Sequence, residues 1–148
     1  MTFQRVGSPS NAHVGRSFEA AAAAALRRAG VVVSAPLSLD IGVGNIKKAH
    51  KFDLGSASPP VVVECKSHRW TAGDNVPSAK MTVWNEAMYY FAITPPEYRR
   101  ILFVLRDYSS VRSSTLAQYY LRTYAHLIPH GVEVWELDQT NKSVSILH

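Results

Sequence analysis

A continuous apolar run, Ile101-Leu102-Phe103-Val104-Leu105, places the tightest limit on the fold of this 148-residue chain. An uninterrupted run of this length is typical of a central strand that is buried on both faces of a sheet. A second apolar run, Val61-Val62-Val63, predicts another strand. Helices cover the faces of such sheets in α/β domains, so the sequence predicts an α/β fold.

The remaining patterns divide between helices and strands. Helices are predicted over the alanine-rich segment 15–29, which stops at Gly30, and over 78–91 and 114–127. Strands are predicted at 31–41, 49–54, 61–67, 100–106, 132–137 and 143–147, with turns at 42–45 and 55–60. The resulting order is αβββαβ followed by a C-terminal helix and a β-hairpin, which predicts a mixed central sheet flanked by helices. Residues 1–148 are expected to form one domain, with the polar residues 1–12 as a flexible arm.

Composition narrows the class of protein. Hydrophobic residues make up 47% of the chain, which is ordinary for a globular domain with a sizeable core. A single cysteine, Cys65, rules out an internal disulfide framework and fits a reducing, cytoplasmic setting. The sequence contains no CxxC motif and no paired Cys/His cluster, so a structural zinc site is not expected. The longest strongly apolar run, 20–26, is too short to span a bilayer, so no membrane is expected.

Charge favours a polyanionic partner. The formal net charge is +5, and basic residues lie on both sides of two acidic positions, Asp53 and Glu64. A nucleic acid is one such partner, although a slightly basic soluble protein without that role would carry the same charge. The residues predicted to contact a nucleic acid are Lys47, Lys48, Lys51, His68, Arg69 and Lys80.

The tripeptide Glu64-Cys65-Lys66 follows the Val61–Val63 run and predicts a polar site at the end of that strand. Alternate side chains of a strand share a face, so Glu64 and Lys66 point one way and Cys65 points toward the core. A buried carboxylate is costly unless it is paired or metal-bound. Asp53 lies on the preceding strand, which is expected to pair with this one. The three charged side chains are therefore expected to meet at one edge of the sheet, an arrangement that suits a divalent metal and a phosphate.

This order of elements resembles the PD-(D/E)XK nuclease superfamily, which includes restriction endonucleases, Holliday-junction resolvases and several repair nucleases. The motif reads Phe52-Asp53 on the second strand and Glu64-Cys65-Lys66 on the third. Glu19, in the sequence Gly15-Arg16-Ser17-Phe18-Glu19, looks like the acid that several branches carry on the first helix. The resemblance covers residues 15–106. Phe52 stands where the family usually has proline.

The resemblance implies a Mg2+-dependent nuclease that hydrolyses phosphodiester bonds in DNA, with Mn2+ as a substitute metal. Asp53, Glu64 and the backbone carbonyl of Cys65 would bind the metal, since Mg2+ prefers oxygen ligands. Lys66 would orient the attacking water and stabilise charge on the phosphate. Glu19 would hold a metal-bound water or a second metal. Cleavage of both strands would be simplest for a C2 homodimer.

Two other functions remain open at this point. One is a nucleic-acid-binding domain of the same fold whose catalysis has lapsed, and the other is a structural or assembly protein. Glu64 and Lys66 on their own also fit a surface ion pair, which contributes little. Glu19 on its own fits an acid in the first turn of a helix, which the helix dipole favours.

Overall fold

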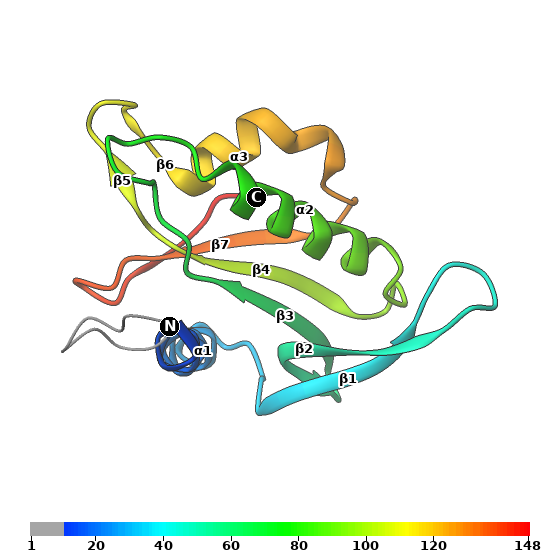
Figure 1. Cartoon of the computed structure of the whole chain (residues 1–148). Coiled ribbons are helices and arrows are strands. Elements are labelled where there is room, and N and C mark those ends of the chain that lie inside the picture. Colours follow the sequence, from blue (N-terminus) through cyan, green and yellow to red (C-terminus); the bar gives the residue numbers. More distant parts are fainter. Residues whose placement is uncertain (1–10) are drawn as a thin grey trace, which may run out of the picture.

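The computed structural model describes residues 11–148 and shows a six-stranded mixed sheet between helices (Figure 1). The predicted α/β fold class is confirmed. The expected arm falls mostly on residues 1–10, outside the described residues, but residues 11 and 12 already belong to the first helix. The elements are α1 (Asn11–Arg28), β1 (Ala35–Ile41), β2 (Lys48–Ala57), β3 (Pro60–Lys66), α2 (Ser78–Ala92), β4 (Arg99–Leu105), β5 (Tyr108–Ser109), β6 (Ser114–Thr115), α3 (Leu116–Tyr124), the 3-10 helix η1 (Ala125–Leu127), β7 (Glu133–Leu137) and β8 (Val144–Ile146).

The strand order of the main sheet is β1-β2-β3-β4-β7-β8. The first three strands form antiparallel pairs, β3 and β7 lie parallel to β4, and β8 returns antiparallel to β7. Residues 101–105 of β4 are buried throughout, so the predicted central strand is confirmed. Helix α1 lies on one side of the sheet, and α2 and α3 lie on the other (Figure 1).

Each face of the sheet has its own apolar core. Under α1, the small side chains of Ala22 and Ala25 bring the helix close to the sheet, where Val61 and Val63 are buried. On the other face, α2 presents Met81, Trp84, Met88 and Phe91 at helical spacing, all of them buried. Burying a large apolar side chain contributes roughly 1.5–3 kcal/mol, so these two cores hold β3 and β4 rigidly in place.

Several predicted boundaries differ from the structure for identifiable reasons. The predicted turn 55–60 is confirmed only at Ser58 and Pro59, because β2 continues through Gly55 to Ala57 and pairs with β3 up to Pro60. A side chain could not replace the glycine there, since a Cβ at Gly55 would lie 2.6 Å from the carbonyl oxygen of Val61. Helix α3 begins later than predicted because Thr115 accepts a hydrogen bond from the Gln118 backbone and caps its first turn.

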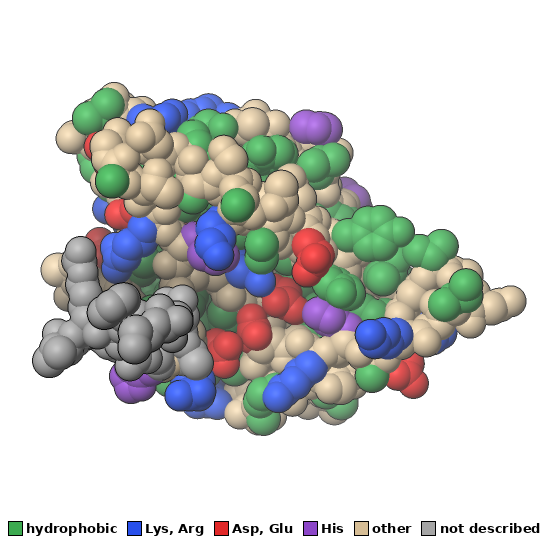
Figure 2. All heavy atoms as spheres, viewed as in Figure 1, with side chains coloured by type: hydrophobic (Ala, Val, Ile, Leu, Met, Phe, Trp, Pro, Cys, Tyr) green, Lys and Arg blue, Asp and Glu red, His purple; other side chains and the backbone are tan. Residues whose placement is uncertain are grey.

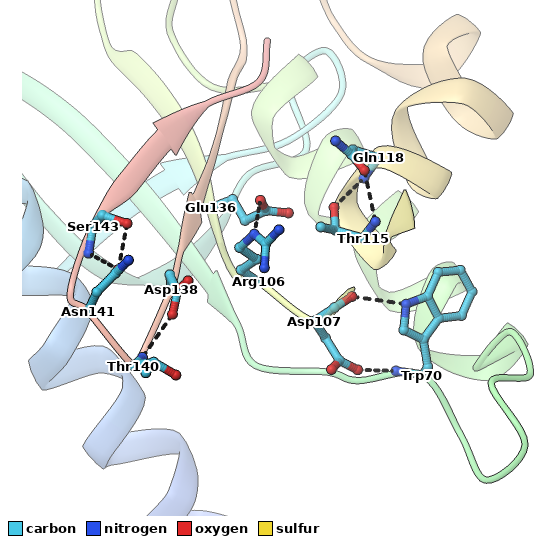
Figure 3. A network of polar contacts seen from close by, with 10 residues as sticks. All are labelled: Trp70, Arg106, Asp107, Thr115, Gln118, Glu136, Asp138, Thr140, Asn141 and Ser143. Carbon is cyan, nitrogen blue, oxygen red and sulfur yellow. Dashed lines mark hydrogen bonds and ion pairs between the residues drawn. The ribbon is translucent and has the colours of Figure 1, made fainter. Parts of the chain in front are cut away.

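The segment that leaves β3 is anchored to the end of β4. The backbone N–H of Trp70 donates to the Asp107 carboxylate at 2.8 Å, and the Trp70 indole donates to the Asp107 carbonyl at 2.9 Å (Figure 3). Trp70 is itself buried. These bonds fix the path of the chain just after Lys66 and thereby place His68 and Arg69 beside the end of the sheet.

Candidate active site

The candidate site forms where β2 and β3 part. Their pairing runs from Ala57–Pro60 to Leu54–Val63 and ends there. Beyond that point β2 continues with β1 into a hairpin that extends from the rest of the sheet, while β3 stays beside β4 (Figure 1). Asp53 on β2 and Glu64 on β3 are the first residues past the last pair, so their backbone groups and side chains border the opening between the strands.

A β-bulge in β2 determines where Asp53 points. The register passes from Ala35–Gly55 to Leu37–Phe52, so two steps on β1 correspond to three on β2. As a result Phe52 packs in the core under α2 and Leu54 packs in the core under α1, although residues two apart on a regular strand share a face. Asp53 lies at this change of face, and its carboxylate accepts a hydrogen bond from the Cys65 backbone N–H at 2.8 Å.

Glu64 is a buried carboxylate with three charged or polar neighbours. It is 6% exposed, which excludes a surface ion pair with Lys66. One oxygen lies 2.9 Å from His50 Nε2 and the other lies 3.9 Å from Lys66 Nζ. Burial raises the pKa of Glu64 to about 8, and Asp53 adds to the rise through its charge and a carboxyl–carboxyl hydrogen bond, against the opposing charge of Lys66. This raised pKa favours a protonated Glu64 near neutral pH unless a cation compensates its charge.

Glu19 joins the same group from α1. It is half-buried, and its pKa is raised by burial, by the charge of Asp53 and by a side-chain hydrogen bond to Asp53. Helix α1 begins at Asn11, so Glu19 lies in the third turn of the helix rather than the first. The helix-dipole explanation for Glu19 is therefore wrong, and the structure brings this acid to Asp53.

Cys65 contributes its backbone rather than its thiol. The side chain packs against the core under α1, and burial, followed by the charges of Asp53 and Glu19, raises the pKa of the thiol. A thiol held in that form is a poor nucleophile. The N–H of Cys65 points toward β2, and the N–H and C=O of one strand residue face the same neighbouring strand. The Cys65 carbonyl thus faces the side on which Asp53 lies.

His50 belongs to this group, although the sequence predicted no role for it. Its ring stacks on Tyr90 at 3.7 Å between centroids and meets Phe52 edge-on at 4.6 Å. Burial lowers the pKa of His50, which favours a neutral ring whose Nε2–H donates to Glu64. Strand alternation could have indicated this position, because His50 and Phe52 are two residues apart on β2 and therefore share a face of the strand before the bulge.

The residues predicted to contact DNA fall in two places. Lys47, Lys48 and Lys51 are exposed along the β1–β2 hairpin, whereas His68 and Lys80 line a pocket near Lys66. Arg69 is exposed too, but its guanidinium lies 3.7 Å from the Asp107 carboxylate. Figure 2 shows acidic side chains gathered in a hollow between α1 and the layer above it, with Lys and Arg side chains around its rim.

The donor set at the strand split fits a hard cation. Mg2+ is usually held by one or two carboxylates and keeps several waters, and Asp53 and Glu64 supply two carboxylates beside the Cys65 carbonyl. Within residues 11–148, no group of three or more His, Cys, Asp or Glu side chains is arranged to enclose an ion. Burial raises the pKa of Glu64 to about 8, so a cation beside these side chains would compensate a negative charge that the buried site disfavours.

Comparisons with protein-family models, curated proteins and solved structures found no match to this chain. In the described part of the chain, no helix combines the length and the apolar character needed to cross a bilayer. Evidence about function therefore comes from the side chains at the strand split and from the basic residues around them.

Proposed function

We propose that this chain is a Mg2+-dependent nuclease that hydrolyses phosphodiester bonds in DNA. The observation that carries the proposal is the burial of Glu64, whose carboxyl group lies beside Asp53 and has Lys66 Nζ 3.9 Å away. An acid pair of this kind costs stability, and it is most readily explained by a ligand that needs negative oxygen donors.

In this proposal Asp53, Glu64 and the Cys65 carbonyl would hold Mg2+, which would lower the pKa of bound water and neutralise charge on the phosphate. Lys66 lies on the same strand face as Glu64 and donates hydrogen bonds to the attacking water and to a phosphate oxygen. Glu19 reaches the group through Asp53 and positions a second water. The attacking water loses one proton to solvent, its oxygen bonds to phosphorus as the bond to the leaving oxygen breaks, and the leaving oxygen takes a proton from solvent.

The basic residues suit a DNA backbone. The net charge of +5 and the exposed lysines of the β1–β2 hairpin supply attraction that does not depend on sequence. Arg69 contributes less than expected, because it already contacts Asp107. Two copies related by a two-fold axis would cut both strands of a duplex.

The proposal is tested by cleavage of supercoiled plasmid with Mg2+ or with EDTA. Wild type is expected to nick the plasmid only with Mg2+. Lys66→Ala is expected to lose cleavage by at least about 100-fold, as for the removal of one donor aimed at developing charge, while its DNA affinity in Ca2+ stays within a few-fold of wild type. Lys51→Ala, which removes a lysine from the hairpin, should lower affinity slightly and leave the rate at saturating DNA unchanged.

Salt-sensitive DNA binding by wild type without cleavage in Mg2+ or Mn2+ would contradict the nuclease and favour a binding domain of the same fold. Cleavage by Lys66→Ala at the wild-type rate would contradict the role of Lys66. Absence of both binding and cleavage would favour a structural protein.

A further inference from the structure

A second feature lies beside the carboxylates and has the opposite character. A pocket of about 480 Å3 opens between the end of β3, the start of α2 and residues 14–15 of α1. Lys66, His68 and Lys80 line it, and no Asp or Glu is among its described lining residues. Lys66 is common to both places, since its Nζ also lies 3.9 Å from Glu64.

The ring of His68 is held in one tautomer by a buried partner. Trp84 Nε1 donates a hydrogen bond to His68 Nδ1 at 2.8 Å, and an indole nitrogen can only donate. His68 Nδ1 must therefore accept, which leaves the proton of the neutral ring on Nε2. Trp84 is fully buried and packs edge-on against Tyr120 at 5.1 Å between centroids, so the donor itself is fixed.

His68 also remains neutral beside two lysines. Burial, then the charge of Lys80, then that of Lys66 lower its pKa to about 4. The positive charge of the pocket thus comes from the lysines, and the ring offers a directed N–H. Two ammonium groups and an N–H donor, without a neighbouring carboxylate in the pocket, suit an anion with several acceptor oxygens.

We propose that this pocket binds a phosphate group of the nucleic-acid backbone through Lys66, Lys80 and the Nε2–H of His68. The inference rests on the proposed nuclease function and adds a second phosphate position next to the phosphate that is hydrolysed. Because Lys66 contacts both positions, a phosphate in the pocket sets the distance of the reacting phosphate from Glu64. Trp84 acts as a positioning residue, since it fixes the ring without reaching the pocket.

Titration of the metal-free full-length protein with inorganic phosphate in EDTA, followed by NMR, tests the pocket separately from cleavage. The NMR signals of the His68 ring nitrogens are expected to show that the proton lies on Nε2. Phosphate is expected to shift the signals of His68 and Lys80. His68→Asn retains an acceptor for the Trp84 indole but lacks the outer donor, so it should weaken phosphate binding by about tenfold. Lys80→Ala should weaken binding similarly, and Arg122→Ala on α3 should bind as wild type does.

His68→Gln provides the matched opposite change, because its longer amide keeps a donor near the Nε2 position and loses the acceptor for Trp84. It should bind phosphate more tightly than His68→Asn while the Trp84 indole signal moves. An Nδ1–H tautomer in wild type, no phosphate binding in EDTA, or wild-type phosphate affinity in both His68→Asn and Lys80→Ala would overturn the inference. Plasmid cleavage without phosphate binding would overturn the phosphate site but not the nuclease. Phosphate binding without cleavage would support the phosphate site and contradict the nuclease.

The source of the phosphate is decided by competition. A 5′-phosphorylated oligonucleotide that displaces inorganic phosphate better than its 5′-hydroxyl counterpart would assign the pocket to a terminal phosphate. Equal displacement by the two would assign it to an internal phosphodiester. Both results support a phosphate site, and a failure of both oligonucleotides to displace phosphate would overturn its assignment to nucleic acid.

Discussion

At the scale of single residues, the proposed chemistry depends on the contacts that hold the carboxyl groups of Asp53 and Glu64. Asp53 gives one carboxylate oxygen to the Cys65 N–H, and Glu64 divides its oxygens between His50 and Lys66. A cation at the strand split would replace the proton of Glu64 and would draw both carboxylates toward one point. The interactions that exist without metal thus keep the ligands within reach of one another.

Asp53→Ala should raise the Mg2+ concentration needed for half-maximal cleavage by more than about tenfold, since even outer-shell changes typically cost 10–100-fold in metal affinity. The measurement is a Mg2+ titration of plasmid cleavage. Glu19→Gln keeps the hydrogen-bonding shape and removes one charge, so its shift should be smaller and in the same direction. Wild-type metal dependence in Asp53→Ala would show that this carboxylate is not a ligand.

At the scale of elements, the lysines proposed to attract DNA and the acids proposed to act on it lie on different sides of the bulge in β2. The lysines of the β1–β2 hairpin lie before the bulge, and the acids lie at and after it. Figure 1 shows the hairpin reaching away from the helical layers, where its basic residues are accessible.

Replacement of Lys47, Lys48 and Lys51 by Gln should therefore reduce the salt dependence of DNA binding, because each lost phosphate contact removes about 0.9 from the slope of log K against log salt. Binding measured across a series of salt concentrations gives this slope, with Arg122→Gln on α3 as the control. The cleavage rate at saturating DNA should stay at the wild-type value. An unchanged slope in the triple variant would place the DNA elsewhere.

The sequence predicts regular elements well and irregular ones poorly, as particular residues show. The apolar run of β4 and the spacing of Met81, Trp84 and Phe91 on α2 follow repeating patterns that burial imposes. The bulge at Asp53 has no comparable pattern, because it depends on how β1 and β2 align across the hairpin.

Contacts between distant segments were equally hidden from the sequence. His50 reaches Glu64, and Trp84 reaches His68, only because the sheet and α2 bring them together. The sequence therefore predicted that Asp53, Glu64 and Lys66 meet at one edge of the sheet, but it did not predict the contacts that His50 and Trp84 make.

At the scale of the whole molecule, the acid group links stability to pH. In the metal-free protein Glu64 titrates with a pKa of about 8, above its ordinary value of 4.5. Between pH 4.5 and pH 8 the folded state therefore keeps a proton that the unfolded state has released. This proton stabilises the fold at low pH, and the stabilisation is lost as pH rises through 8. A cation that binds only the folded state would restore it.

Asp53→Asn removes the neighbouring charge and keeps an acceptor for the Cys65 N–H, so it should be more stable than wild type at pH 8–9 in EDTA. Thermal unfolding measures the difference, at about 2–4 °C per kcal/mol for a domain of this size. Mg2+ should raise the unfolding temperature of wild type and not of Asp53→Asn. Identical pH profiles for the two proteins would show that the acids do not interact as described.

The central claim is that Asp53, Glu64 and the Cys65 carbonyl share one divalent cation. A crystal soaked in Mn2+ tests it most directly, because anomalous scattering locates the metal independently of activity. The account predicts one Mn2+ site at the strand split, bound by both carboxylates and the carbonyl, with Lys66 Nζ nearby. A Mn2+ ion bound elsewhere, or none at the split while Glu64 stays hydrogen-bonded to His50, would contradict it.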